Sequence, residues 1–139
     1  MIELDNRTSL DVNEQLLAKI TKTLTKKDIE LIITTDKEMR DINKEHRNID
    51  KSTDVLSFPY EDMPMSPLGS IVISSSHVEN KAKELSHKSD DELTLLYIHG
   101  LLHLLGFDHE VDSGEMREKE KQLIEQFNLP SSLIVRTEG

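Results

Sequence analysis

The chain has 139 residues, of which 32% are charged, and this length suffices for one domain with a single hydrophobic core. It contains no cysteine, which excludes disulfides and leaves His, Asp and Glu as candidate metal ligands. A formal net charge of −10 argues against a protein that coats nucleic acid through a broad positive field, although an enzyme can still reach RNA through a local basic patch.

The first residues lack the basic start and apolar stretch of a secretory signal. The longest apolar-rich run, residues 93–107, is too short and too polar to cross a membrane, because threonine, histidine and glycine interrupt it. We therefore expect a cytoplasmic protein.

Strands and helices alternate in the first half of the predicted order. Apolar and β-branched residues predict strands at 2–4 and 29–35, and apolar residues at helical spacing predict a helix at 11–24. Asp36 can cap a second helix that runs to about residue 46.

The second half is predicted to hold two strands and then three helices. Pro59 places the strand at 55–60 at a sheet edge, and a loop leads to a strand at 69–74. Ser75 or Ser76 can cap a helix to about residue 87, and Ser89 and Glu92 have capping-box spacing for the next helix. The predicted helices end with a charged one at 112–127.

The predicted fold class is α+β. Residues 1–139 form a single domain with a mixed sheet of about four strands packed with about five helices. We expect the helix at 93–105 to be the most buried element and to carry the functional site, because it is apolar nearly all round apart from two histidines.

Three histidines within a short segment are the strongest chemical signal. His99 and His103 are four residues apart and share one helix face, and Gly106 can end the helix so that the chain turns back and brings His109 over that face. Three imidazoles leave the fourth tetrahedral position of a zinc ion to water, which is typical of a catalytic site. Such an ion lowers the pKa of its water from about 15.7 to around 7. The ligand set predicts one zinc ion, although imidazole also suits copper, iron and nickel.

The same spacing matches the metzincin protease pattern His-Glu-x-x-His-x-x-Gly-x-x-His. Gly100 stands where those proteases have the glutamate that acts as general base. Its absence argues against peptide hydrolysis, whereas phosphodiester cleavage can rely on a metal-bound nucleophile and positive charge.

The run His-Gly-Leu-Leu-His-Leu-Leu-Gly-Phe-Asp-His, residues 99–109, resembles the signature of the YbeY family of bacterial zinc-dependent endoribonucleases. Two further blocks are similar to the family: Arg47 followed by Ser-Thr-Asp-Val-Leu-Ser-Phe-Pro at 52–59, and Leu-Gly-Ser-Ile-Val-Ile at 68–73. Ser52 stands where the family usually has proline, and Ser70 where it has an acidic residue, so no carboxylate role is carried over to position 70.

The resemblance implies a single-strand-specific endoribonuclease that acts in ribosomal RNA processing, notably at the 3′ end of the small-subunit RNA, and in ribosome quality control. It implies RNA and the ribosome or ribosomal proteins as partners. The zinc ligands of the family fall on His99, His103 and His109, and its catalytic arginine falls on Arg47.

Three further residues, Arg47, Asp108 and Asp54, have alternative interpretations. Arg47 is a candidate for a two-pronged phosphate contact, or it is a solvated arginine at the end of a charged helix. Asp108, beside the third predicted ligand, can orient an imidazole or hold the attacking water, or it can simply cap the turn after Gly106. Asp54 is expected to have a structural role, as a cap or as a strand-end hydrogen-bond acceptor.

The remaining polar residues have simpler interpretations. His46, His77 and His87 are expected at the surface, and the charged run 115–125 is expected to be a solvated helix face. An RNA-facing basic patch is predicted from Arg40, Lys44, Arg47 and Lys51.

Two functions compete with a ribonuclease. The first is a metzincin-like zinc protease, which the missing glutamate disfavours. The second is a non-enzymatic ribosome assembly factor with structural zinc, which an open fourth coordination position disfavours.

Overall fold

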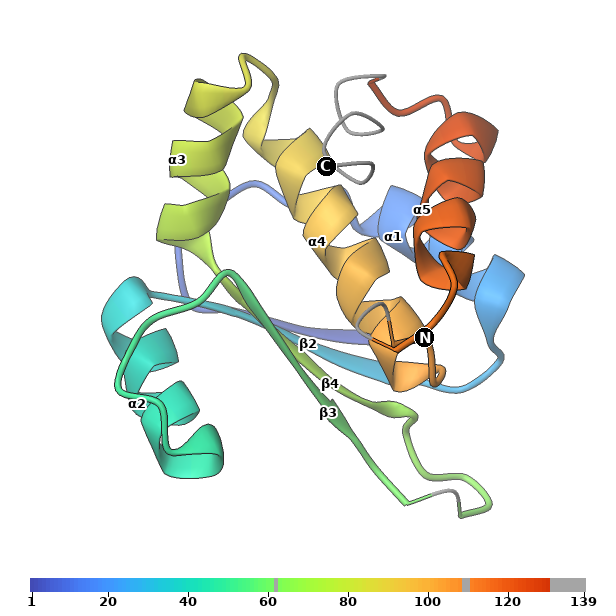
Figure 1. Cartoon of the computed structure of the whole chain (residues 1–139), viewed down its shortest axis with the longest axis horizontal. Coiled ribbons are helices and arrows are strands. Elements are labelled where there is room, and N and C mark those ends of the chain that lie inside the picture. The colour runs from blue at the N-terminus through green and yellow to red at the C-terminus, as the bar shows by residue number, and fades with distance from the viewer. Residues whose placement is uncertain (62, 109–110, 131–139) are drawn as a thin grey trace.

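Four strands form a mixed sheet in the order β1-β2-β4-β3 within the computed structural model, which describes residues 1–61, 63–108 and 111–130 (Figure 1). Strands β1 (Ile2–Asn6), β2 (Ile29–Thr34) and β4 (Gly69–Ser74) are parallel, and β3 (Val55–Pro59) pairs antiparallel with β4. β3 is an edge strand, as Pro59 predicted.

Five helices accompany the sheet in the described part of the chain. They are α1 (Glu14–Leu24), α2 (Asp36–Arg47), α3 (Ser75–Glu84), α4 (Ser89–Leu104) and α5 (Glu115–Gln126). The predicted α+β class and its element order are confirmed.

The first two helix starts differ from the prediction because other side chains cap them. α1 begins after Asn13, whose side chain accepts the N–H of Leu16 at 3.2 Å, and not at residue 11. Thr35, not Asp36, caps α2, and its hydroxyl accepts the N–H of Glu38 at 3.3 Å.

The later helix boundaries were also partly wrong. Ser74 occupies the cap position of α3, in place of Ser75 or Ser76, and α3 ends at residue 84 and not near 87. Ser89 already belongs to α4, so it forms no capping box with Glu92. α5 begins at residue 115 and not at 112, because the carboxylate of Asp112 accepts N–H groups of its first turn and its cap residue.

Helix α4 packs across one face of the sheet and α2 covers the other (Figure 1). Apolar side chains of α4 pack against those of β2 and β4, and the remaining apolar face of α4 packs against α1 and α5. Eleven of the residues of α4 are buried, as expected for the most buried helix. The histidines therefore lie at the end of a rigid central element.

No helix in the described ranges is long and apolar enough to cross a membrane.

Candidate functional site

A pocket of about 580 Å³ lies where the end of α2, the edge strand β3 and the last turn of α4 meet. Four of the predicted site residues, Arg47, His99, His103 and Asp108, line it together. The complete lining is Arg47, Asp54, Val55, Leu56, Ser57, Pro59, His99, His103, Gly106, Phe107 and Asp108.

His99 and His103 bring their Nε2 atoms close together. The Nε2 atoms of His99 and His103 lie 3.2 Å apart, and the ring planes meet at 78°. Two nitrogens bound tetrahedrally to zinc at about 2.0–2.1 Å would lie about 3.3 Å apart. The spacing of the pair therefore fits two ligands of one zinc ion.

The Nδ1 atom of each imidazole is also hydrogen-bonded to the protein. Nδ1 of His99 lies 2.6 Å from Oε1 of Glu120 on α5, and Nδ1 of His103 lies 3.1 Å from the carbonyl oxygen of Phe107. A carboxylate and a carbonyl are acceptors, so each Nδ1 donates its proton and each Nε2 presents a lone pair. This is the supporting arrangement usual for metal-binding histidines.

The turn after α4 explains the position of the Phe107 carbonyl. Gly106 has a φ of 100°, which side chains resist, and its N–H donates to the carbonyl of His103 at 3.0 Å. The N–H of Phe107 donates to the carbonyl of Leu102 at 3.0 Å. These two bonds form a Schellman motif, which ends the helix as the glycine predicted and folds the chain back beside His103.

The third predicted ligand, His109, lies outside the described residues. Within the described ranges, no group of three His, Cys, Asp or Glu residues is placed to hold a metal ion. His99 and His103 are the two predicted ligands that lie within the described residues.

Arg47 and the two aspartates lie around the histidine pair. Arg47 is the exposed last residue of α2 and reaches the pocket wall. The carbonyl of Asp108 accepts N–H groups of the turn toward α5, and the residue is part of the pocket lining. Oδ1 of Asp54 accepts the N–H of Val55 at 2.8 Å, in agreement with a strand-end role.

Gly100 faces the sheet at a very close approach. A Cβ at this position would lie 2.9 Å from Cγ2 of Ile71 and 3.1 Å from Oγ of Ser57. The Ser57 hydroxyl donates to the Gly100 carbonyl at 3.0 Å. A glutamate does not fit here, so the position that supplies the general base of metzincins is closed by packing.

The predicted basic patch is partly neutralised. Arg40, Lys44 and Arg47 are spaced to share one face of α2. Nε of Arg40 donates to Asp50 at 2.7 Å, and this hydrogen bond raises the pKa of Arg40 and lowers the pKa of Asp50. Within the patch, Arg47 is the residue that lines the pocket.

Glu120 is the functional candidate that the sequence analysis missed. Residues 115–125 were expected to form a solvated face, but Glu120 is only 5% exposed and contacts His99. Its spacing from Met116 and Ile124, which are both buried, places it on the apolar stripe of α5. An acid on an apolar stripe is the signal that could have identified it.

The prediction of three surface histidines was wrong for His87. Its side chain is 4% exposed, and its Nε2 lies 3.0 Å from Oε1 of the buried Glu92. His46 is exposed and its ring contacts Phe58, and His77 lies 3.1 Å from Oδ1 of Asp36.

Ser70 lies away from the histidine pocket. Its hydroxyl donates to Oε2 of Glu30 at 3.0 Å, and the hydroxyl of Tyr60 donates to the same oxygen at 2.7 Å. Ser70 shares the β4 face of Val72, which packs toward α2 and not toward α4. The serine at this position therefore leaves the histidine site untouched.

Comparisons with known proteins agree on one family. The family model for endoribonuclease YbeY matches residues 2–128. The endoribonuclease YbeY of Sulfurimonas denitrificans is 66% identical over 139 residues, with both chains fully covered. That of Aliarcobacter butzleri is 59% identical, with 98% of this chain and 99% of the relative covered.

A solved structure shows the same fold. A solution structure of a Thermotoga maritima protein matches with a TM-score of 0.63 and 30% sequence identity, and the match covers 91% of this chain and 89% of the other. Together with the sequence matches, this confirms the resemblance seen in the motifs. The chain belongs to the YbeY endoribonuclease family.

Proposed function

We propose that this endoribonuclease cleaves single-stranded RNA with one zinc ion held by His99, His103 and His109. The observation that supports this most directly is the pair of Nε2 atoms 3.2 Å apart, each backed through Nδ1, in a pocket that also contains Arg47. A bound zinc ion would supply a Lewis acid and a water that ionises near neutral pH.

The residues of the chain would divide the remaining work. The guanidinium of Arg47 would bind two oxygens of the scissile phosphate and neutralise the charge that develops on them. Glu120 and the Phe107 carbonyl would keep the imidazoles of His99 and His103 in the metal-binding tautomer.

Asp108 is proposed to accept a hydrogen bond from the attacking water. It has two alternative roles at the site, and the first, orienting an imidazole, is already filled by other acceptors for His99 and His103. Asp108 lines the same pocket as Arg47 and the histidines, which is where a water would approach the phosphate.

The biological substrate is proposed from the resemblance to the family. We propose that the RNA is ribosomal, that the cut contributes to maturation of the small-subunit 3′ end and to ribosome quality control, and that the ribosome or its proteins are partners in the cytoplasm. The overall negative charge supports a specific partner over nonspecific binding to RNA.

The decisive experiment is cleavage of labelled single-stranded RNA by the purified protein, beside His103→Ala and Arg47→Ala. His77→Ala is the matched control, because this histidine pairs with Asp36, at the opposite end of α2 from Arg47, and does not line the pocket. We expect cleavage by wild type and His77→Ala, loss in the other two, and loss on chelation with recovery on added zinc. Equal cleavage by His103→Ala and wild type would refute the proposed site.

The metal is tested separately from activity. Elemental analysis of the purified wild type should give one zinc per chain, and His103→Ala should give far less. Stoichiometric iron, copper or nickel in place of zinc would overturn the choice of metal and leave the ligand set standing.

A further inference from the structure

Phe107 forms a wall between two cavities. On one side it lines the pocket of Arg47 and the histidines, and on the other it lines a neighbouring hollow of about 480 Å³ against α5. Its backbone is fixed by the Schellman motif, and its half-buried side chain packs against the apolar cluster of α1, α4 and α5 that includes Leu102. The residue therefore places an aromatic ring next to the proposed reacting centre.

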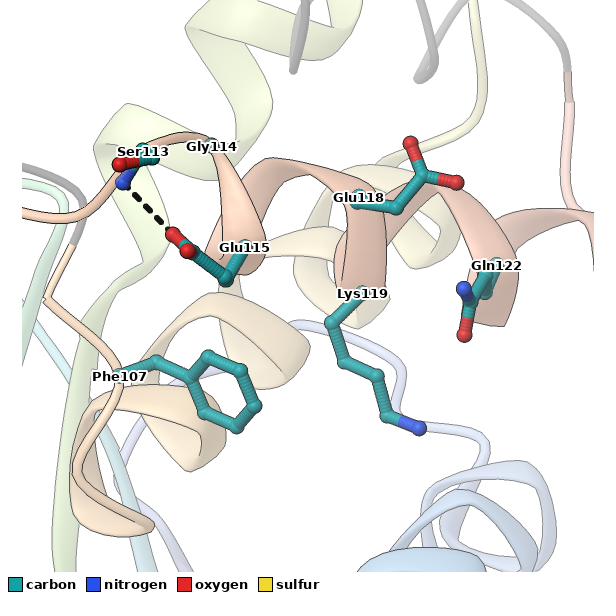
Figure 2. Close-up of a pocket in the computed structure, with 7 residues that line it drawn as sticks. All are labelled: Phe107, Ser113, Gly114, Glu115, Glu118, Lys119 and Gln122. Carbon is teal, nitrogen blue, oxygen red and sulfur yellow. Dashed lines mark hydrogen bonds between the residues drawn. The ribbon is translucent and has the colours of Figure 1, made fainter.

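The hollow beside the ring presents hydrogen-bonding side chains from α5. Lys119 and Gln122 extend from the helix on the side of the Phe107 ring (Figure 2). The two acidic residues of the lining do not face the ring with a free carboxylate. Glu115 accepts the N–H of Ser113 at 2.6 Å, and Glu118 points away from the ring (Figure 2).

The chemistry of this hollow suits a nucleobase better than a phosphate. A base can stack on an aromatic ring while an amide and an ammonium group bond to its polar edge. A phosphate would find a single cation, Lys119, in the lining, with the carboxylate of Glu115 nearby. The cation expected to hold phosphate, Arg47, lies across the histidine pocket, so backbone and base would occupy opposite sides of Phe107.

We propose that this hollow binds one unpaired nucleobase of the RNA strand whose phosphate lies at the histidines, with the base stacked on Phe107 and its edge bonded by Lys119 and Gln122. This inference rests on the proposed ribonuclease function. It explains a requirement for single strands, because a paired base is not free to enter the hollow.

The test combines altered RNA with altered protein. Binding of a short fluorescein-labelled single-stranded RNA is measured by anisotropy in the presence of a chelator, so that nothing is cut, and compared with RNAs that each carry one abasic site. We expect one abasic position to weaken wild-type binding by about 5- to 150-fold, the range for one stacked base. Phe107→Leu should lose that position dependence, and Phe107→Tyr should retain it.

Gln122→Ala keeps the test valid if Phe107→Leu fails to fold, because Gln122 is exposed. It should reduce the penalty at the same abasic position, whereas Gln126→Ala, on the same helix outside the hollow, should not. A flat abasic scan with an RNA that wild type binds, and cleaves once zinc is restored, overturns the base site and leaves the ribonuclease function standing. An RNA that wild type neither binds nor cleaves overturns both.

Discussion

Glu120 offers the sharpest test of how the site is built. Glu120→Gln keeps the size and shape of a side chain that is 5% exposed, so the packing of α5 on α4 should be preserved. It removes the negative charge 2.6 Å from Nδ1 of His99. The amide oxygen can still accept the hydrogen bond, but a neutral acceptor makes Nε2 a weaker base and hence a weaker metal ligand.

The expected loss of zinc affinity is about 10- to 100-fold, the range for removal of a partner behind a metal-binding histidine. This corresponds to about 1.4 to 2.8 kcal/mol of binding free energy. The assay is competition for zinc between the metal-depleted protein and a chromophoric chelator. Glu125→Gln is the matched control, because it removes the same charge from an exposed position on the same helix.

A zinc dissociation constant of Glu120→Gln that matches those of wild type and Glu125→Gln would refute the reasoning. Unfolding of the metal-depleted proteins by urea, followed by circular dichroism, serves as the check on folding. If Glu120→Gln unfolds at the same urea concentration as wild type, a weaker affinity is assigned to the lost charge and not to a displaced helix.

Three further predictions test other parts of the molecule. Arg47→Ala should lower kcat by about 10²- to 10³-fold, as for loss of one transition-state donor, with Arg47→Lys recovering part of it and the melting temperature unchanged. Gly106→Ala should lower the free energy of unfolding by about 1 to 2 kcal/mol, because φ is 100° there, and should also weaken zinc binding; Gly114→Ala, with a φ of 106°, should share only the first effect. Burial raises the pKa of Tyr97 to about 12, although the hydrogen bond with Thr21 opposes this shift. The unfolded side chain begins to ionise near pH 10, so the stability that the neutral tyrosine contributes is complete below pH 10 and is lost as the pH rises to about 12. This loss is about 3 kcal/mol, and urea unfolding of Tyr97→Phe between pH 9 and about 12 should lack it; an identical pH dependence in both proteins would contradict the burial argument.

The histidine pair could be predicted from the sequence because its geometry is local. Four-residue spacing on a helix places His99 and His103 on one face in any fold, and a glycine after the last turn predicts the reversal that follows. The length of the chain indicated a single domain, and its negative charge argued against a protein that coats nucleic acid. None of these inferences depends on which elements pack against α4.

Glu120 and His87 were misplaced because their environments are tertiary. Glu120 is 21 residues from His99 and meets it only through the packing of α5 on α4. His87 is buried by the turn between α3 and α4, which the prediction had made helical. Asp36 failed as a helix cap for a similar reason, because its Oδ1 accepts from Ser74 and lies beside His77, both far from it in sequence.

The site therefore depends on two kinds of structure, one local in sequence and one formed by tertiary packing. The local structure is α4 with its Schellman turn, and it determines where the Nε2 atoms lie. It should tolerate substitutions elsewhere, because α4 is buried on nearly every side. The tertiary contact is the carboxylate of Glu120, which α5 brings to Nδ1 of His99 and which strengthens Nε2 of His99 as a metal ligand. α5 is in turn anchored at its start by Asp112, whose Oδ2 accepts the N–H of Met116 at 3.0 Å, and by apolar packing of Met116 and Leu123. Substitutions that loosen α5 should therefore weaken metal binding without touching a ligand, whereas those on the exposed face of α2 should alter phosphate binding and leave metal affinity unchanged.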